Sequence, residues 1–205
     1  MRRIVYFLLF ASMAILSGCA ALKHNVKFEQ PTEGPRARVR VVIPAKLSHY
    51  RGVRAFPNSD CVFDVNSPGN GNVVAAWYGF EANLTKQKLG MPETALSVKK
   101  DTNQAEIFVV ARQPIVFRYR LPDMSVPMSA PVHGYYRVRI IPGCAVAVSF
   151  TPEAEADYEL EFGDLTACSY DLFQLNALPE AAAPFRAKRI HMKQCKPARL
   201  PWFLK

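Results

Sequence analysis

The chain contains few of the residue patterns that mark catalytic or metal-binding sites. Its 10 glycines form neither a Gly-x-Ser-x-Gly elbow nor a phosphate-binding loop. No Cys-x-x-Cys pair is present, and the four histidines (His24, His49, His133 and His191) lack the spacing of metal ligands on a helix. The sequence therefore predicts no metal, no cofactor and no enzyme. A hydrolase whose site is assembled from residues distant in sequence stays open as an alternative.

Long apolar runs are also scarce. The run over residues 4–16 is shorter than the about 20 residues that a transmembrane helix needs. It follows Arg2 and Arg3 and ends in Leu16-Ser17-Gly18-Cys19. This arrangement resembles the signal peptide of bacterial lipoproteins.

The resemblance implies that the chain is cut before Cys19, that palmitate or a similar chain is attached to this cysteine, and that the new amino terminus is acylated. In such lipoproteins an aspartate after the cysteine causes retention at the inner membrane, whereas this chain has Ala20 there. The expected location is therefore the periplasmic face of the outer membrane, which makes nucleic acid an improbable partner. Ordinary secretory cleavage near Ala20 or Ala21 is the alternative.

These features divide the chain into four parts. Residues 1–18 are the expected signal peptide, and residues 19–35 are the lipidated cysteine with a flexible tether. Residues 36–195 form the expected folded domain, and residues 196–205 are a basic and aromatic tail. Half of all residues are hydrophobic, so a buried core is expected, and the net charge of +9 suits an anionic surface or an acidic partner.

Without Cys19, an even set of four cysteines remains, namely Cys61, Cys144, Cys168 and Cys195. In an exported protein such a set indicates two disulfides, although the sequence leaves all three pairings open. Their wide spacing does not resemble a zinc site. We expect two intrachain disulfides and no free thiol among the four.

Runs with a period of two, bounded by Gly, Pro and Asn, dominate the domain. This pattern predicts an all-β fold with little helix, an antiparallel β-sandwich of transthyretin-like or immunoglobulin-like type. One short helix is expected within residues 82–100 and another turn at Pro179–Ala183. The expected strands begin at Arg36 and also lie near Asn72–Phe80, Glu106–Ala111, Pro114–Leu121, Tyr135–Ile141, Cys144–Phe150, Asp157–Phe162 and Leu165–Leu175.

The segment Tyr135–Phe162 is the best candidate for a hairpin, because Pro142-Gly143 separates two alternating runs. Its order of strand, Pro-Gly, strand and Tyr-containing strand, followed by a run led by Cys168, weakly resembles small transthyretin-like β-sandwich lipoproteins of unknown function. The resemblance implies no catalytic residues.

Arginines alternate with apolar residues in three of the expected strands. The alternation predicts that these arginines point to solvent, and that Val39, Val41, Phe117, Tyr119, Val138 and Ile140 are buried. If the strands are neighbours, the arginines form a basic sheet face for an anion; if Asp157, Glu159 and Glu161 lie opposite them, they form structural ion pairs. The arginines are Arg36, Arg38, Arg40, Arg118, Arg120, Arg137 and Arg139.

The C-terminal segment carries no acidic residue after Glu180. Basic residues alternate there with Phe185, Trp202 and Phe203, which suits a membrane surface or a polyanion. The alternative is a final strand over residues 185–192, held by Cys195, with a tail that packs on the domain.

Two functions of different class are consistent with these observations. The first is a non-enzymatic module, anchored by lipid, that binds an envelope protein through edge strands or loops. The second is a binder of anionic envelope polymer, lipopolysaccharide or peptidoglycan, through the arginine face or the basic tail.

Overall fold

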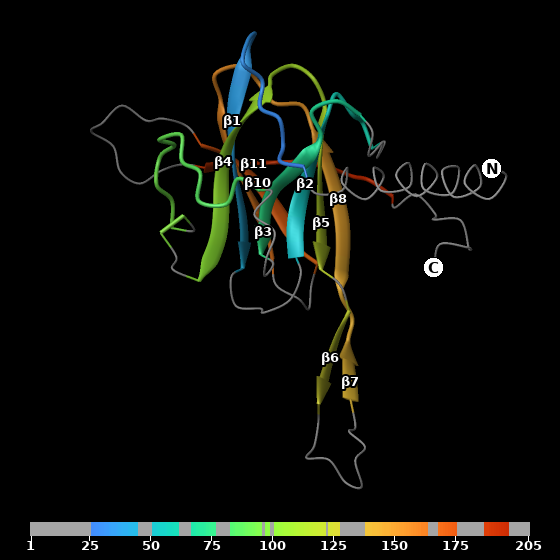
Figure 1. The fold of residues 1–205 in the computed structure, drawn as a ribbon. Helices are drawn as coiled ribbons and strands as arrows, with labels where there is room; N and C mark the ends of the chain where they lie inside the picture. The colour runs from blue at the N-terminus through green and yellow to red at the C-terminus, as the bar shows by residue number, and fades with distance from the viewer. Residues whose placement is uncertain are drawn as a thin grey trace, which may run out of the picture.

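The computed structural model describes residues 26–44, 51–61, 67–76, 83–95, 97–98, 101–121, 123–127, 138–163, 168–175 and 187–196. These residues form twelve strands and no helix. Two five-stranded sheets pack face to face, and a separate two-stranded ribbon extends beyond them (Figure 1). The predicted all-β sandwich is confirmed.

The first sheet has the strand order β11-β10-β9-β1-β4. Strand β1 lies between β4 and β9, and it pairs antiparallel with β4 and parallel with β9. The parallel pairing places Arg38 beside Asp157 and Arg40 beside Glu159. The strands are β1 (Arg36–Pro44), β4 (Thr102–Val110), β9 (Asp157–Phe162), β10 (Tyr170–Leu175) and β11 (Ala187–Ile190).

The second sheet has the order β12-β8-β5-β2-β3, and all its pairings are antiparallel. Its strands are β2 (Arg51–Pro57), β3 (Gly71–Ala76), β5 (Ile115–Leu121), β8 (Cys144–Phe150) and β12 (Lys193–Gln194). The predicted strands are confirmed wherever the structure describes them. Strands β2 and β12 are additions to the predicted set. Gly52 and Pro57 interrupt the alternating pattern of β2, and β12 has only two residues.

The core consists of the inward side chains of both sheets. Aromatic rings join the sheets across the interior, with centroid distances of 5.0 Å from Tyr119 to Phe162 and 5.2 Å from Phe150 to Tyr158. Small β-branched residues fill the space around them, and Val39 and Val41 are fully buried. The period of two in the sequence therefore selects the core face correctly.

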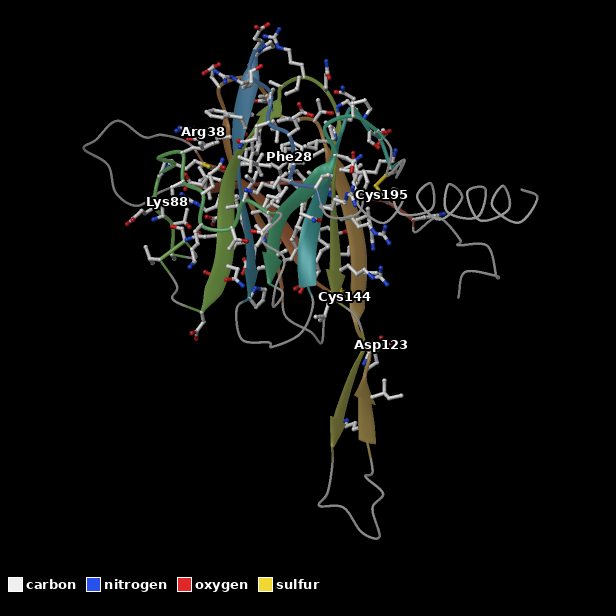
Figure 2. All side chains as sticks on the ribbon, in the orientation of Figure 1. Phe28, Arg38, Lys88, Asp123, Cys144 and Cys195 are labelled. Atoms are coloured by element: carbon white, nitrogen blue, oxygen red, sulfur yellow. A yellow bond between two sulfur atoms is a disulfide. The ribbon has the colours of Figure 1, made fainter. Side chains whose placement is uncertain are left out.

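Residues 26–35, assigned above to a flexible tether, instead contact the sandwich. Phe28 is 4% exposed and belongs to the core. Figure 2 labels it within the sandwich. The Phe28 amide donates to the Asn72 carbonyl of β3, and the Phe108 amide of β4 donates to Oε1 of Gln30. The tether prediction therefore applies only to residues before Val26, which lie outside the described residues. This segment also covers backbone groups of β3 and β4, the strands at one edge of each sheet.

The predicted hairpin over Tyr135–Phe162 is wrong. Strand β7 (Val138–Ile141) pairs with β6 (Met124–Pro127), whereas β8 pairs with β5. The chain therefore does not reverse at Pro142-Gly143. These two residues separate β7 from β8, and the antiparallel pairing continues from β6–β7 into β5–β8. The next connection, from β8 to β9, crosses to the other sheet.

The predicted helix over residues 82–100 is also wrong for residues 83–95 and 97–98, which contain turns and extended backbone. Lys86 and Gly90 have positive φ angles, which a helix does not allow. The segment instead bonds to β4, since the Lys86 amide donates to Gln104 and the Glu106 amide donates to Gln87. The predicted turn at Pro179–Ala183 lies outside the described residues.

Both predicted disulfides are present. Cys61 is bonded to Cys195, 134 positions later, and Cys144 is bonded to Cys168, 24 positions later. The first bridge packs on a small apolar cluster on the outer face of the second sheet, formed by Phe56, Val116 and Ala147. The second joins the start of β8 to residues just before β10.

Candidate functional site

The seven predicted arginines do not form one surface. Arg36, Arg38 and Arg40 lie on β1 in the first sheet, whereas Arg118 and Arg120 lie on β5 in the second. The two sheets pack face to face (Figure 1). Val39 and Phe117, which alternate with these arginines, are buried between the sheets, so the two groups of arginines lie on opposite outer faces of the sandwich. Arg139 lies on the ribbon strand β7, and Arg137 lies outside the described residues.

Two of the three β1 arginines form ion pairs within the first sheet, whereas Arg36 lies over the Phe108 ring, 4.7 Å from its centroid. The Arg38 guanidinium donates two parallel hydrogen bonds to Asp157, of 2.6 and 2.7 Å. Arg40 lies between two glutamates, with distances of 2.7 Å from Nη2 to Glu106 Oε1 and 3.0 Å from Nη1 to Glu159 Oε2. Of the two alternatives stated above, structural ion pairs with acids of the neighbouring strands is therefore the correct one for Arg38 and Arg40.

The prediction that Arg40 points to solvent is wrong, because it is 2% exposed. The segment over residues 83–98, here called the strap, covers the outer face of the sheet at this point. Its Met91 carbonyl accepts from Arg40 at 3.1 Å, and its Thr94 hydroxyl donates to Glu159 at 2.7 Å. Arg40 does lie on the outer face of the sheet, as predicted, but the strap covers it and excludes solvent.

Glu106 joins β4 to the strap. Burial favours its neutral form, but hydrogen bonds from the Leu89 amide, from Arg40 and from the Met91 amide outweigh this effect and lower the pKa of Glu106 below its ordinary value of 4.5. The carboxylate therefore stays ionised between Arg40 and two strap amides. The sequence pattern marks Glu106 only as the start of a strand, and it carries no sign that Arg40, 66 positions earlier, is its partner.

The other predictions from the alternation have mixed outcomes. Val39, Val41, Phe117 and Tyr119 are buried as predicted. Ile140 is 66% exposed and contradicts the prediction, because β7 lies in the ribbon, outside the two packed sheets. The side chain of Val138 lies outside the described residues.

The β5 arginines gain a third member that the sequence analysis missed. Arg54 of β2 lies directly opposite Arg118 of β5, and Arg120 lies two residues further on the same face. Arg54 donates to Asn70 Oδ1, at 2.9 Å from Nε, and lies over the Phe56 ring. The pKa of the Arg118 guanidinium is lowered, mainly by burial and to a smaller extent by the positive charge of Arg120. We call Arg54, Arg118 and Arg120 the arginine cluster.

The ribbon formed by β6 and β7 leaves the sandwich at a reinforced base. The register continues from the Leu121–Cys144 pair of the sheet to the Met124–Ile141 pair of the ribbon. Between them the Gly143 amide donates to Asp123 Oδ1 at 2.7 Å. Figure 2 shows Asp123 at this junction, with Cys144 at the adjacent end of the sandwich.

Several predicted residues lie outside the described residues: Cys19, His24, His49, His133 and the tail from residue 197 onward. Lys196 is exposed. His191 lines a hollow of about 500 Å³ beside β10 and β11, together with Tyr170 and the ion pair of Asp171 with Arg189.

Among the described residues no group of His, Cys, Asp or Glu has the arrangement of a metal site. The described residues contain no helix that is long and apolar enough to cross a membrane. Comparisons with models of protein families, with curated proteins and with solved structures give no match for this chain.

Proposed function

We propose that the chain is a lipoprotein anchored to the periplasmic face of the outer membrane, and that it acts as a non-enzymatic module that binds an envelope protein through the β6–β7 ribbon. The lipid on Cys19 supplies the attachment, and the sandwich supplies a rigid support. The observation that carries the proposal is the exposed ribbon itself.

Exposure of the ribbon supports a role in recognition. Ile140 is 66% exposed on a strand where Arg139 is exposed as well. An isolated two-stranded ribbon has little stability of its own, because each of its faces lacks a covering layer. A large apolar residue and an arginine on such an element are typical of protein contacts, in which a few anchor residues supply most of the binding energy.

The base of the ribbon restricts its motion relative to the sandwich. The Cys144–Cys168 disulfide and the bond from the Gly143 amide to Asp123 lie where the ribbon leaves the sheet. A restricted element loses less conformational entropy on binding, so it binds more tightly for the same contacts.

Site-specific photocrosslinking in intact cells tests the proposal. A photoreactive amino acid in place of Arg139 should give one discrete protein adduct, and the same probe in place of Val98, which is 58% exposed elsewhere on the domain, should not. The additional change Ile140→Asp should remove the adduct from position 139. Absence of an adduct there, or an adduct that persists with Ile140→Asp, would contradict the proposal.

A further inference from the structure

The two packed sheets end in β11 and β4 and in β12 and β3, and three of these edge strands are protected. The strap covers β4, since its Lys86 amide donates to the Gln104 carbonyl at 2.7 Å. The N-terminal segment covers β3, where the Asn72 amide donates to the Val26 carbonyl. Strand β12 is only two residues long. Open strand edges pair readily with other chains, and covering or shortening them prevents this.

Strand β11 is the fourth edge strand, and it has no such cover in the part of the chain that the structure describes. It pairs with β10 on one side, and no described residue bonds to the backbone on its other side. Ala187, Lys188 and Arg189 are exposed. The strand also contains no proline, the residue that would remove an amide donor from the edge.

The register shows which backbone groups of β11 face the open edge. The Gly163 amide donates to the Ser169 carbonyl at 2.8 Å, so Ser169 directs its backbone groups toward β9. In antiparallel strands these groups alternate between the two sides, so Leu172, an odd number of positions later, directs them toward β11. Leu172 pairs there with Ile190. Because Ile190 uses its backbone groups for β10, the amide and carbonyl of Arg189 face outward.

The open edge therefore has the pattern that one more strand requires. Ala187 lies two positions before Arg189 and directs its backbone groups to the same side. The two residues together present two donors and two acceptors at the spacing of a β-strand. An extended peptide can add to such an edge through main-chain hydrogen bonds.

The charges at this edge favour an acidic partner. The Arg189 side chain is 73% exposed although it pairs with Asp171, and Lys188 has no carboxylate partner among the described residues. Pairing of β11 with β11 of a second copy would bring these cations together, and like charges in opposed positions destabilise a sheet. Carboxylates in the added strand would instead lie beside Lys188 and Arg189.

A hollow of about 500 Å³ lies where β11 ends. Tyr170 of β10 and Ile190 of β11 line it and pack on the core, so this part of its wall is apolar. His191 and the ion pair of Asp171 with Arg189 supply polar groups around it. Where a peptide binds as an added strand, backbone bonds give affinity and pockets for its side chains give specificity. The hollow has room for one apolar side chain of such a peptide.

From the open edge, its charge and the adjoining hollow we infer that β11 binds an acidic, extended segment of a partner protein as an added strand of the first sheet. One apolar side chain of this segment enters the hollow, and its carboxylates lie beside Lys188 and Arg189. This contact is separate from the ribbon, because β11 and β7 belong to different sheets.

Fluorescence anisotropy with the full chain in a neutral detergent tests the inference. The probe is a labelled peptide in which Glu and Val alternate, and a peptide of alternating Lys and Val controls for charge. Two further forms of the Glu peptide carry N-methyl groups, either on all Glu amides or on all Val amides, so each form can pair along only one of its edges.

Two variants of the chain test the edge itself. Ala187→Pro removes one outward amide without changing the charge. The matched control, Ala187→Val, keeps this amide in a residue that suits a strand.

We expect the Glu peptide to bind, and the Lys peptide to bind at least about tenfold more weakly. One of the two methylated forms should lose binding by a similar factor, and so should Ala187→Pro, because each loses backbone hydrogen bonds of the added strand. Ala187→Val should bind as the unmodified chain does. If Ala187→Pro does not fold, the two methylated peptides on the unmodified chain still decide the question.

No binding of the Glu peptide, equal affinities of its two methylated forms, or equal affinities of Ala187→Pro and Ala187→Val would overturn the inference. Binding that is kept in Ala187→Pro and lost with Ile140→Asp would do the same, because the peptide would then occupy the ribbon. A dimer of the unmodified chain in sedimentation that Ala187→Pro dissociates would assign the edge to a second copy and would also overturn it.

Discussion

Arg40 and its two glutamates form the most buried charged group in the described part of the chain. Their side chains are between 2% and 6% exposed. Removing charges from water is costly, and it is tolerated when each charge has a close partner of opposite sign. Here two carboxylates face one guanidinium, and the excess negative charge is balanced by amides of Leu89 and Met91 and by the Thr94 hydroxyl.

Replacement of Arg40 should therefore be strongly destabilising. Arg40→Met leaves two buried carboxylates without their cation, and we expect a loss of about 3–5 kcal/mol in the free energy of unfolding. Urea denaturation measures this change, and Lys188→Met, at an exposed position, should cost less than about 0.5 kcal/mol. Adding Glu106→Gln and Glu159→Gln to Arg40→Met should restore part of the loss. A loss below about 1 kcal/mol for Arg40→Met would show that the ion group contributes little.

Glu106 should also make stability depend on pH. Its pKa in the folded protein is below the ordinary value of 4.5, so the unfolded chain takes up a proton first as the pH falls. The contribution of Glu106 is therefore complete above about pH 4.5 and is lost as the pH falls through the folded pKa. Denaturation curves measured downward from pH 7 should show a smaller decline for Glu106→Gln than for the unmodified chain. An equal decline in both would contradict this assignment.

The residue scale also shows where sequence reasoning ends. The alternation around Arg38 and Arg40 correctly identified which side chains point away from the core. It could not show that the strap over residues 83–98 covers them, because a pattern with a period of two distinguishes inward from outward and not covered from exposed. The burial predicted for Ile140 is wrong for the opposite reason. Its place in the alternation is that of a core residue, but β7 lies in the ribbon, outside the two packed sheets.

At the scale of elements, the N-terminal segment Val26–Glu29 acts as part of the sandwich. Phe28 enters the core, and the Asn72 amide of β3 donates to the Val26 carbonyl at 2.8 Å. The segment passes so close to Gly71 that a Cβ atom there would lie 2.2 Å from the Lys27 carbonyl oxygen. Only glycine permits this approach of two backbones.

Gly71→Ala should therefore displace the segment. We expect a loss of about 1–3 kcal/mol in the free energy of unfolding, the usual range for overpacking. Phe28→Ala alone should cost about 3–5 kcal/mol through the cavity that it leaves. Because both changes affect the same contact, the double variant should cost less than the two single losses together. Full additivity in urea denaturation would contradict the coupling.

Strand identity was predictable from sequence, but strand pairing was not. Period-two runs located β1, β5, β8 and β9, because each buries one face. The hairpin prediction was wrong because Pro142-Gly143 can separate two consecutive strands, here β7 and β8, as readily as it can form a turn. The false helix over residues 82–100 arose because a strap that bonds to the edge of β4 has no periodicity of its own.

At the scale of the whole molecule, arginines that share one alternating pattern in the sequence lie in two different sheets. The same alternation occurs on β1 and on β5, yet one strand pairs with acids of β9 and the other with Arg54 of β2. Such pairings join residues far apart in the chain, so only the fold determines which arginines are structural and which form the arginine cluster. The even number of cysteines likewise predicted two disulfides but not their pairing.

We propose that lipid on Cys19 holds the sandwich at the outer membrane. The most direct measurement is labelling of cells with radioactive palmitate, followed by fractionation, for the unmodified chain, for Cys19→Ala and for the control Ser17→Ala. We expect label and outer-membrane location for the unmodified chain and the control, and neither for Cys19→Ala. Unchanged labelling of Cys19→Ala, or an unlabelled soluble product of the unmodified chain that begins near Ala20 or Ala21, would contradict it.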